Sequence, residues 1–276
     1  MGRILALVLI FYSLSFGQKA KNILNVDEPG KAILKTFAMC EYKLVLKDPK
    51  DKEIKIGVTQ IGNSWFAGSH GEKFDYIVTV NHLIKCDSTI VELEQGGILD
   101  KYDKIHDEDL RITNVIGLKD GQLKNISAYT FEGIPVRDIK ILFDSPVSGD
   151  DADKALLGGV VDENVFHNHF ILMEDGVFDE IFYKNGIGKA VVVRGFFSLD
   201  GGWRFRYKTL EIESLWPEVF QASGFLNSSL SGNPVTYFHD DRLYAIGIAA
   251  SVEKNVPDMA YVTIVKKSFL EKRNKK

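Results

Sequence analysis

Short runs of β-branched and aromatic residues recur along the chain, separated by residues that favour tight turns. Two such runs, Tyr42 to Leu46 and Ile54 to Ile61, flank a polar turn around Asp48-Pro49, a pattern typical of an antiparallel hairpin. Other turn sequences are Asp120-Gly121, Asp200-Gly201-Gly202 and His239-Asp240-Asp241. The strongest apolar runs are Tyr76 to Val80, Ile139 to Phe143, Ala190 to Val193, Tyr244 to Ala249 and Ala260 to Val265. Regularly spaced hairpins at this length predict an all-β protein built as barrels or sandwiches.

No long segment of the sequence repeats a helical period. The short segment from Val265 to Lys275 could form a helix, and we expect a short C-terminal helix there with Phe269 and Leu270 facing inward. The polar stretch from Ser148 to Lys154 divides the remaining chain into two parts of comparable size. The predicted domains are therefore residues 18–147 and residues 148–276.

The N-terminus has the pattern of a secretory signal peptide. Arg3 precedes an apolar run from Ile4 to Phe16, and Ser15 and Gly17 are small residues at the spacing that a signal peptidase accepts. We expect residues 1–17 to be removed by cleavage after Gly17, which predicts a secreted or periplasmic protein. A retained membrane anchor is the alternative, but the run is shorter than the roughly 20 apolar residues that cross a bilayer as a helix. We therefore expect no stable membrane insertion after cleavage.

The charge balance and the two cysteines indicate which partners and which cellular compartment the protein has. Lys plus Arg number 34 against 38 Asp plus Glu, and the net charge of -4 gives no general reason to expect a nucleic-acid partner. Cys40 and Cys86 would meet an oxidising compartment after export, so one disulfide is plausible, although two separate buried thiols also fit the sequence.

Three fragments carry a resemblance to a known family. Tyr76-Ile-Val-Thr-Val-Asn-His82-Leu-Ile resembles the strand that carries the catalytic histidine in trypsin-like (chymotrypsin-fold) serine peptidases. Arg137-Asp138-Ile-Lys-Ile-Leu142 resembles the strand that an aspartate opens, and Ser229-Leu230-Ser231-Gly232-Asn233-Pro234-Val235 is similar to the nucleophile loop. The secreted bacterial branch, including HtrA-like enzymes, is the closer comparison, without an appended PDZ-type module. The resemblance implies two packed antiparallel six-stranded β-barrels, the first carrying His82 and Asp138 and the second Ser231.

The chemistry of that family explains the three residue types. A serine hydroxyl is a weak nucleophile at neutral pH and needs a base that takes its proton during attack. The resemblance implies that Ser231 is the nucleophile, His82 the base and Asp138 the group that orients the imidazole. It also implies an oxyanion hole made by the backbone N–H groups of Ser229 and Ser231. The expected activity is serine endopeptidase activity on a protein or peptide substrate, and the same triad would also serve an esterase.

Two positions depart from the family pattern. Ser229 stands where the family usually has Gly, and Leu230 stands where it has Asp or Asn. Both changes put the oxyanion hole in doubt, because the backbone at the first position adopts a conformation that glycine reaches most easily. The alternative function is therefore a catalytically inactive binding or scaffold protein of the same fold.

The remaining candidate residues concern specificity and metals. Aligned on Ser231, Phe225 falls at the base of the primary pocket and Ala249, Ala250 and Ser251 along its wall. Without a carboxylate at the floor, we expect uncharged, apolar side chains at the cleaved position. His167 and His169 share one face of a strand, but two ligands make no closed site, so we expect no metal and no organic cofactor.

Overall fold

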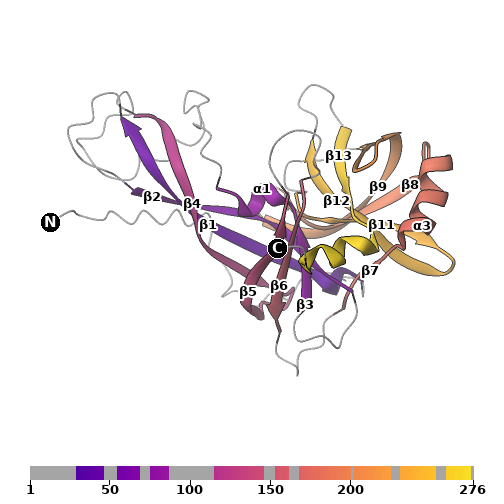
Figure 1. Ribbon diagram of the computed structural model, residues 1–276, viewed down its shortest axis with the longest axis horizontal. Helices are drawn as coiled ribbons and strands as arrows, with labels where there is room; N and C mark the ends of the chain where they lie inside the picture. The colour runs from indigo at the N-terminus through magenta and orange to yellow at the C-terminus, as the bar shows by residue number, and fades with distance from the viewer. Residues whose placement is uncertain are drawn as a thin grey trace. The chain divides into compact units, whose positions relative to one another are not determined.

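The computed structural model describes residues 29–46, 55–68, 75–86, 115–145, 153–161, 168–199, 202–224, 231–252 and 259–274 (Figure 1). These residues are mostly strands. A first closed barrel has the strand order β1-β2-β3-β6-β5-β4. Its strands are β1 (Ile33–Leu46), β2 (Lys55–Ala67), β3 (Asp75–Thr79), β4 (Val115–Tyr129), β5 (Pro135–Asp144) and β6 (Ala155–Val160).

A second sheet has the order β11-β8-β9-β10-β13-β12-β7, and an additional β11–β12 pairing closes its first six strands into a ring. Its strands are β7 (Ile171–Leu172), β8 (Ala190–Leu199), β9 (Gly202–Leu215), β10 (Val219–Ser223), β11 (Pro234–His239), β12 (Arg242–Val252) and β13 (Met259–Ile264). The predicted all-β fold of two six-stranded antiparallel barrels is confirmed. The short β7 adds to this ring by pairing in parallel with β12.

The division between the two barrels lies later in the chain than predicted. β6 pairs with both β3 and β5, so it completes the first barrel. The sequence-based boundary at residue 147 was therefore one strand too early. It followed the polar stretch from Ser148 to Lys154, which is the connection between β5 and β6 rather than a linker between barrels.

Helical segments are short. The turn α1 (Asn81–Ile84) follows β3, and η5 (Lys267–Asn274) is a 3-10 helix that confirms the predicted C-terminal helix. Phe269 of η5 is buried, as expected. The sequence pattern missed a second helical segment, α3 (Asp175–Phe178) continuing into η3 (Asp179–Tyr183), which covers the core of the second barrel with Phe178 and Phe182 (Figure 1).

Turn chemistry was informative at one site and misleading at another. Asp240 and Asp241 both have positive φ in the tight turn between β11 and β12, as the hairpin pattern predicts. Asp120 also has positive φ, but it lies inside β4, which runs through the predicted turn at Asp120-Gly121. An isolated αL residue therefore distorts that strand locally without ending it.

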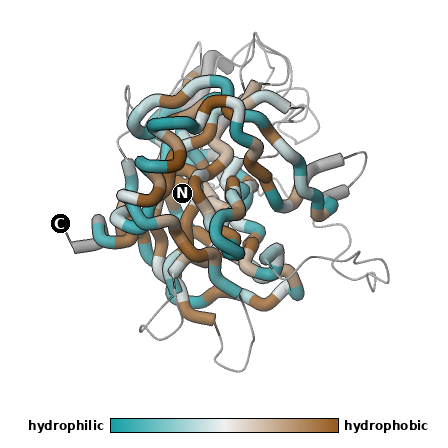
Figure 2. Tube along the Cα trace, turned by 90° about the vertical axis from the view of Figure 1, so that its right-hand side faces the viewer, coloured by the Kyte–Doolittle hydropathy of each residue, from teal (hydrophilic) through white to brown (hydrophobic). Residues whose placement is uncertain are grey.

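Strand burial follows from position. β10 alternates buried and half-buried residues, whereas β3 and β6 are buried almost throughout. Figure 2 shows hydrophobic and hydrophilic residues interspersed along the Cα trace. β3 and β6 contribute to a cluster that also contains residues of β7, β12 and η5, and this shared cluster packs the two barrels together. Its members include Trp65, Val78, Leu156, Phe170, Leu172, Ala245, Ile248 and Phe269.

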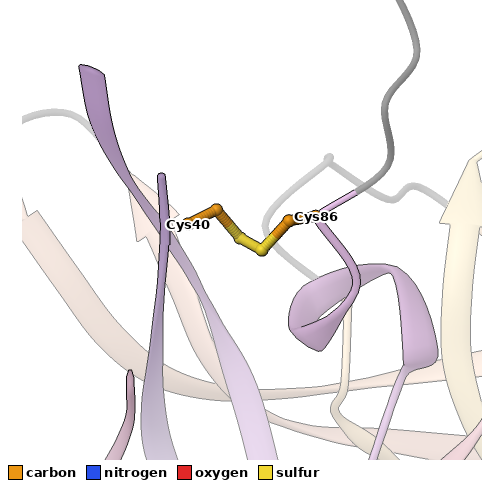
Figure 3. The surroundings of a disulfide bond; sticks show 2 residues. All are labelled: Cys40 and Cys86. Carbon is orange, nitrogen blue, oxygen red and sulfur yellow. A yellow bond between two sulfur atoms is a disulfide. The ribbon is translucent and has the colours of Figure 1, made fainter. Parts of the chain in front are cut away.

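Contacts divide the described chain into two compact units. Residues 38–46, 55–60, 84–86 and 115–126 form one unit, and all other described residues form the second. Cys40 and Cys86 are disulfide-bonded within the first unit, with Cα atoms 5.6 Å apart, so the pairing that the sequence left open is formed (Figure 3). Tyr42 lies buried in the same small cluster, against Val58 and Leu123.

Candidate active site

The turn α1 presents His82 to solvent. Asn81 is buried and donates from Nδ2 to the carbonyl of Ser145 at 2.6 Å. On the other side Leu83 is buried and donates its backbone N–H to the Val80 carbonyl at 3.3 Å. Both neighbours are thus fixed in the protein while the His82 side chain keeps 45% of its surface exposed. The turn therefore holds an accessible imidazole on a backbone that is anchored on both sides.

Asp153 is the carboxylate that holds this imidazole. Its Oδ1 accepts the backbone N–H of His82 at 2.8 Å, and its Oδ2 contacts the ring Nδ1. With the carboxylate at Nδ1, the neutral ring carries its proton there, and Nε2 is left as an acceptor. This is the tautomer that a general base needs.

Strand pairing places Asp153 at this point. Thr79, at the end of β3, is paired with Ala155, at the start of β6. Asp153 precedes Ala155 by two residues, so it lies beside the chain that leaves β3 for α1. Ser145, immediately after β5, holds the residue that follows Asp153. Its N–H donates to the Lys154 carbonyl at 3.2 Å, and its Oγ accepts the Lys154 N–H at 3.3 Å.

Lys154 extends this support to the second barrel. Its side chain is only 7% exposed, and its ammonium contacts Glu218 and donates to the Ile264 carbonyl at 3.1 Å. Nζ also lies 5.4 Å from the centre of the Phe269 ring. The residue beside Asp153 is thereby tied to the connection before β10, to the end of β13 and to η5.

Asp138, the aspartate expected to orient His82, lies elsewhere. It is exposed in β5, with φ 54°, between the register pairs Arg137↔Val160 and Lys140↔Gly158. It is therefore level with the end of β6, whereas Asp153 precedes its start. Five residues of strand, at about 3.4 Å each, separate these ends by about 17 Å. The structure corrects the expected partner of His82 from Asp138 to Asp153.

Ser231 lies in a turn immediately before β11. Its carbonyl accepts the Asn63 N–H of β2 at 3.1 Å, and the following Gly232 donates its N–H to the Ala249 carbonyl of β12 at 2.9 Å. Its Oγ donates to the Ala250 carbonyl at 3.1 Å. The β12–β13 register shifts between Ala249 and Ser251, and this irregularity leaves the Ala250 carbonyl available for the hydroxyl.

Gly232 fits this turn because it has no side chain. Its φ of 88° lies in the left-handed region, and a Cβ there would overlap the backbone carbonyl of Asn63. The close approach brings the turn that carries Ser231 directly onto β2.

Gly62 of β2 links the turns that carry His82 and Ser231. A Cβ on Gly62 would lie 3.0 Å from a methyl group of Leu83 and 3.4 Å from the carbonyl oxygen of Ser231. Both turns therefore rest on the same point of β2. His82 and Ser231 are residues of neighbouring segments, although 149 positions of sequence separate them.

Other expected site residues are placed in part. Ser229 of the expected oxyanion hole and Phe225 of the expected pocket lie outside the described residues, as does His167. Ala249 and Ala250 are buried in separate hydrophobic clusters, and Ser251 continues β12. His169 contacts Asp75 through Nε2 at 2.7 Å. Within the described ranges, no group of three or more potential metal-ligating side chains gathers.

Sequence reasoning missed Asp153. Both candidate aspartates precede apolar runs in the sequence: Asp138 precedes Ile139 to Phe143, and Asp153 precedes Ala155 to Leu157. The local signal was thus present twice, and only the strand order distinguishes the two positions.

Among the described residues, no helix is long and apolar enough to cross a membrane.

Comparisons agree with this architecture at the level of fold. No protein-family model and no curated protein sequence matches the chain. Among solved structures, the thermostable serine protease AL20 from an extremophilic microorganism is similar with a TM-score of 0.50 at 7% identity, over 90% of this chain and 97% of that one. The active form of the Rv3671c protease from M. tuberculosis has a TM-score of 0.49 at 12% identity, over 89% and 82%. Tobacco Etch Virus protease has a TM-score of 0.48 at 10% identity, over 92% and 82%.

These identities restrict the likeness to the fold. The chain has the chymotrypsin-like fold of two six-stranded antiparallel barrels. The likeness in fold rests on AL20, whose TM-score is 0.50 over 90% of this chain.

Proposed function

We propose that the protein is a serine endopeptidase whose triad is Ser231, His82 and Asp153. The observation that carries the proposal is the two-point contact of Asp153 with the backbone N–H and the ring Nδ1 of His82. That contact supports the proposal because it holds the imidazole in the tautomer that a base needs, and the turns that carry His82 and Ser231 both lie against Gly62.

The reaction begins when the Ser231 hydroxyl leaves the Ala250 carbonyl. A rotation about χ1 breaks that hydrogen bond, which costs about 1 kcal/mol net, and turns the proton toward Nε2 of His82. Oγ then attacks the substrate carbonyl carbon while its proton passes to Nε2. Asp153 stabilises the imidazolium that forms and remains ionised.

Collapse of the tetrahedral intermediate completes acylation. The C–N bond breaks, and the imidazolium gives its proton to the leaving amine. A water molecule then attacks the acyl-enzyme with His82 again taking the proton, and Ser231 is released with its hydroxyl restored. The oxyanion of each intermediate would be stabilised by the backbone N–H groups of Ser229 and Ser231.

Export and specificity belong to the same proposal. The Cys40–Cys86 bond supports the secreted or periplasmic location that the N-terminal pattern favours, because disulfides persist in oxidising compartments. Preference for uncharged, apolar side chains at the cleaved position and membership of the HtrA-like branch rest on the sequence resemblance.

Labelling with a fluorophosphonate probe tests the proposal. The wild-type chain should be labelled at Ser231, and both Ser231→Ala and His82→Ala should remove the label. Cleavage of casein, with the product ends read by mass spectrometry, distinguishes a peptidase from an esterase. A folded wild-type chain that never reacts would contradict the proposal.

That negative result would favour an inactive relative that keeps the fold for binding. The specific observation behind this second candidate is the hydrogen bond from Ser231 to Ala250, because the single hydroxyl proton is then directed away from His82. Ser229 and Leu230 support it further, since both depart from the family pattern of the nucleophile loop.

A further inference from the structure

Cationic side chains of β9 follow one face of the sheet beside residues 231–233, the turn that carries the proposed nucleophile Ser231 and is called the nucleophile turn below. Along β9, the residues facing Val193, Gly195 and Phe197 of β8 are Lys208, Arg206 and Arg204. Residues directly opposite each other in an antiparallel pair share a face. Val193 lies in the core of the second barrel, so this face runs from that core toward the row of Arg206 and Arg204.

The nucleophile turn meets this same face at Gly195. β11 pairs with β8 through Val235↔Val193, and continuing that register by two residues brings Asn233 opposite Gly195. The side chains confirm it, because a Cβ on Gly195 would overlap the Asn233 amide. Asn233 also donates from Nδ2 to the Phe196 carbonyl at 3.5 Å.

One row therefore crosses three strands: Asn233 on the β11 side, Gly195 in the middle and Arg206 on β9. Neighbouring strands lie about 4.8 Å apart, so the Cα atoms of Asn233 and Arg206 are about 10 Å apart. Gly195 has no side chain, and the buried Asn233 amide occupies the space where its Cβ would lie. An extended peptide covers about 10 Å with three residues, which sets the reach from the nucleophile turn to Arg206.

Arg206 and Arg204 are available for a ligand. Both are exposed, and two residues of strand separate them by about 7 Å on one face. Arg206 donates from Nη1 to the Phe205 carbonyl at 3.4 Å, a bond that leaves its remaining N–H groups for other partners. In a chain of net charge -4, two adjacent guanidinium groups are a local concentration of opposite charge.

We propose that Arg206 and Arg204 form a substrate subsite for a carboxylate side chain of the peptide, within about three residues of the cleaved bond. This subsite rests on the proposed peptidase function and names part of its substrate class. It is separate from the primary pocket, which the sequence predicts to take an uncharged side chain. Guanidinium groups suit this ligand because their paired N–H donors match the two oxygens of a carboxylate.

Binding to the Ser231→Ala chain tests the subsite without requiring turnover. Fluorescein-labelled peptides of alanine around one central phenylalanine carry a single glutamate, scanned over the three positions on each side, or a lysine at the same positions. Fluorescence anisotropy gives Kd for each peptide in low-salt buffer. We expect at least one glutamate position to bind about tenfold more tightly than its lysine counterpart, and added salt to reduce the difference.

Charge reversal locates the preference. Arg206→Glu and Arg204→Glu should each remove or invert the preference for glutamate, while Arg242→Glu should leave it unchanged. Arg242 is an exposed residue that pairs with His239 at the far end of β11, so it carries the same charge change away from the row. Equal Kd values for glutamate and lysine peptides, or a preference that survives Arg206→Glu, would overturn the subsite.

The result is separable from the enzyme proposal. A chain that binds glutamate peptides through Arg206 but is never labelled by a fluorophosphonate keeps the subsite and loses the peptidase function. A chain that is labelled and cleaves peptides without any preference for acidic residues keeps the peptidase function and loses the subsite.

Discussion

Replacing Asp153 by asparagine tests whether the aspartate that contacts His82 in the structure, rather than Asp138, is the acid of the proposed triad. Asp153 accepts two hydrogen bonds, from the backbone N–H and from the ring Nδ1 of His82. Asparagine has one acceptor oxygen. If that oxygen keeps the backbone N–H, the amide NH₂ faces Nδ1, which must then become an acceptor, and the ring proton moves to Nε2.

That tautomer removes the base from Ser231. We expect the second-order rate of fluorophosphonate labelling to fall by about four orders of magnitude, equivalent to about 5.5 kcal/mol at 1.36 kcal/mol per tenfold. Stability should hardly change. The two side chains keep 45% and 32% of their surfaces exposed, and ion pairs at such exposure contribute about 0–1 kcal/mol.

Asp138→Asn is the matched control. Asn tolerates the positive φ at this position as well as Asp does, so the backbone of β5 should be unaffected. Labelling should stay within about twofold of wild type. Rates should be measured alongside urea unfolding curves for both variants. Slow labelling in Asp138→Asn with normal labelling in Asp153→Asn would refute the assignment, and normal rates in both would exclude either carboxylate as the partner of the base.

Three further predictions concern the free energy of unfolding. Gly232→Ala should lower it by about 2–4 kcal/mol, because the new Cβ meets the Asn63 carbonyl. Gly133→Ala has a similar φ but open space around the Cβ, so it should lower the free energy by only about 1 kcal/mol, and equal shifts of the two urea midpoints would contradict the steric argument. Lys154→Met should lower the free energy of unfolding by about 1–3 kcal/mol, because the buried Ile264 carbonyl loses its donor. The variant should also slow labelling, since Lys154 adjoins Asp153, the proposed triad acid. A wild-type labelling rate would show that Lys154 does not influence the position of Asp153. Cys40→Ser should lower the free energy of unfolding by about 4 kcal/mol, the value expected for a disulfide that joins residues 46 positions apart. A reductant should destabilise the wild type and not the variant. If it destabilises both chains, the effect of the reductant does not come from this disulfide.

Local patterns predicted the strands well because their apolar runs are bounded by strong turn residues. The run from Tyr76 to Val80 and the run from Ala260 to Val265 correspond to β3 and β13. The pattern failed where one residue had two explanations. Asp120-Gly121 has the composition of a turn, but β4 accommodates it as a local distortion.

Two of the candidate residues have a local signal in the sequence. His82 lies in the turn that follows the buried strand β3, and Ser231 precedes a glycine that its turn requires, so the sequence alone can propose both residues. The acid could not be chosen in that way, because Asp138 and Asp153 both precede apolar runs in the sequence. Only the pairing of β6 with β3 distinguishes the two positions, and that pairing joins residues 76 to 84 positions apart in the chain.

The hydrophobic cluster shared by the barrels has a consequence for folding as a unit. Val78 and Leu156 of the first barrel and Ala245 and Ile248 of the second bury their surfaces in one common interior. A half expressed alone would expose its part of that interior to water and be prone to aggregate. The two barrels should therefore melt in a single cooperative transition, and a cut between them should yield fragments that are recovered only together.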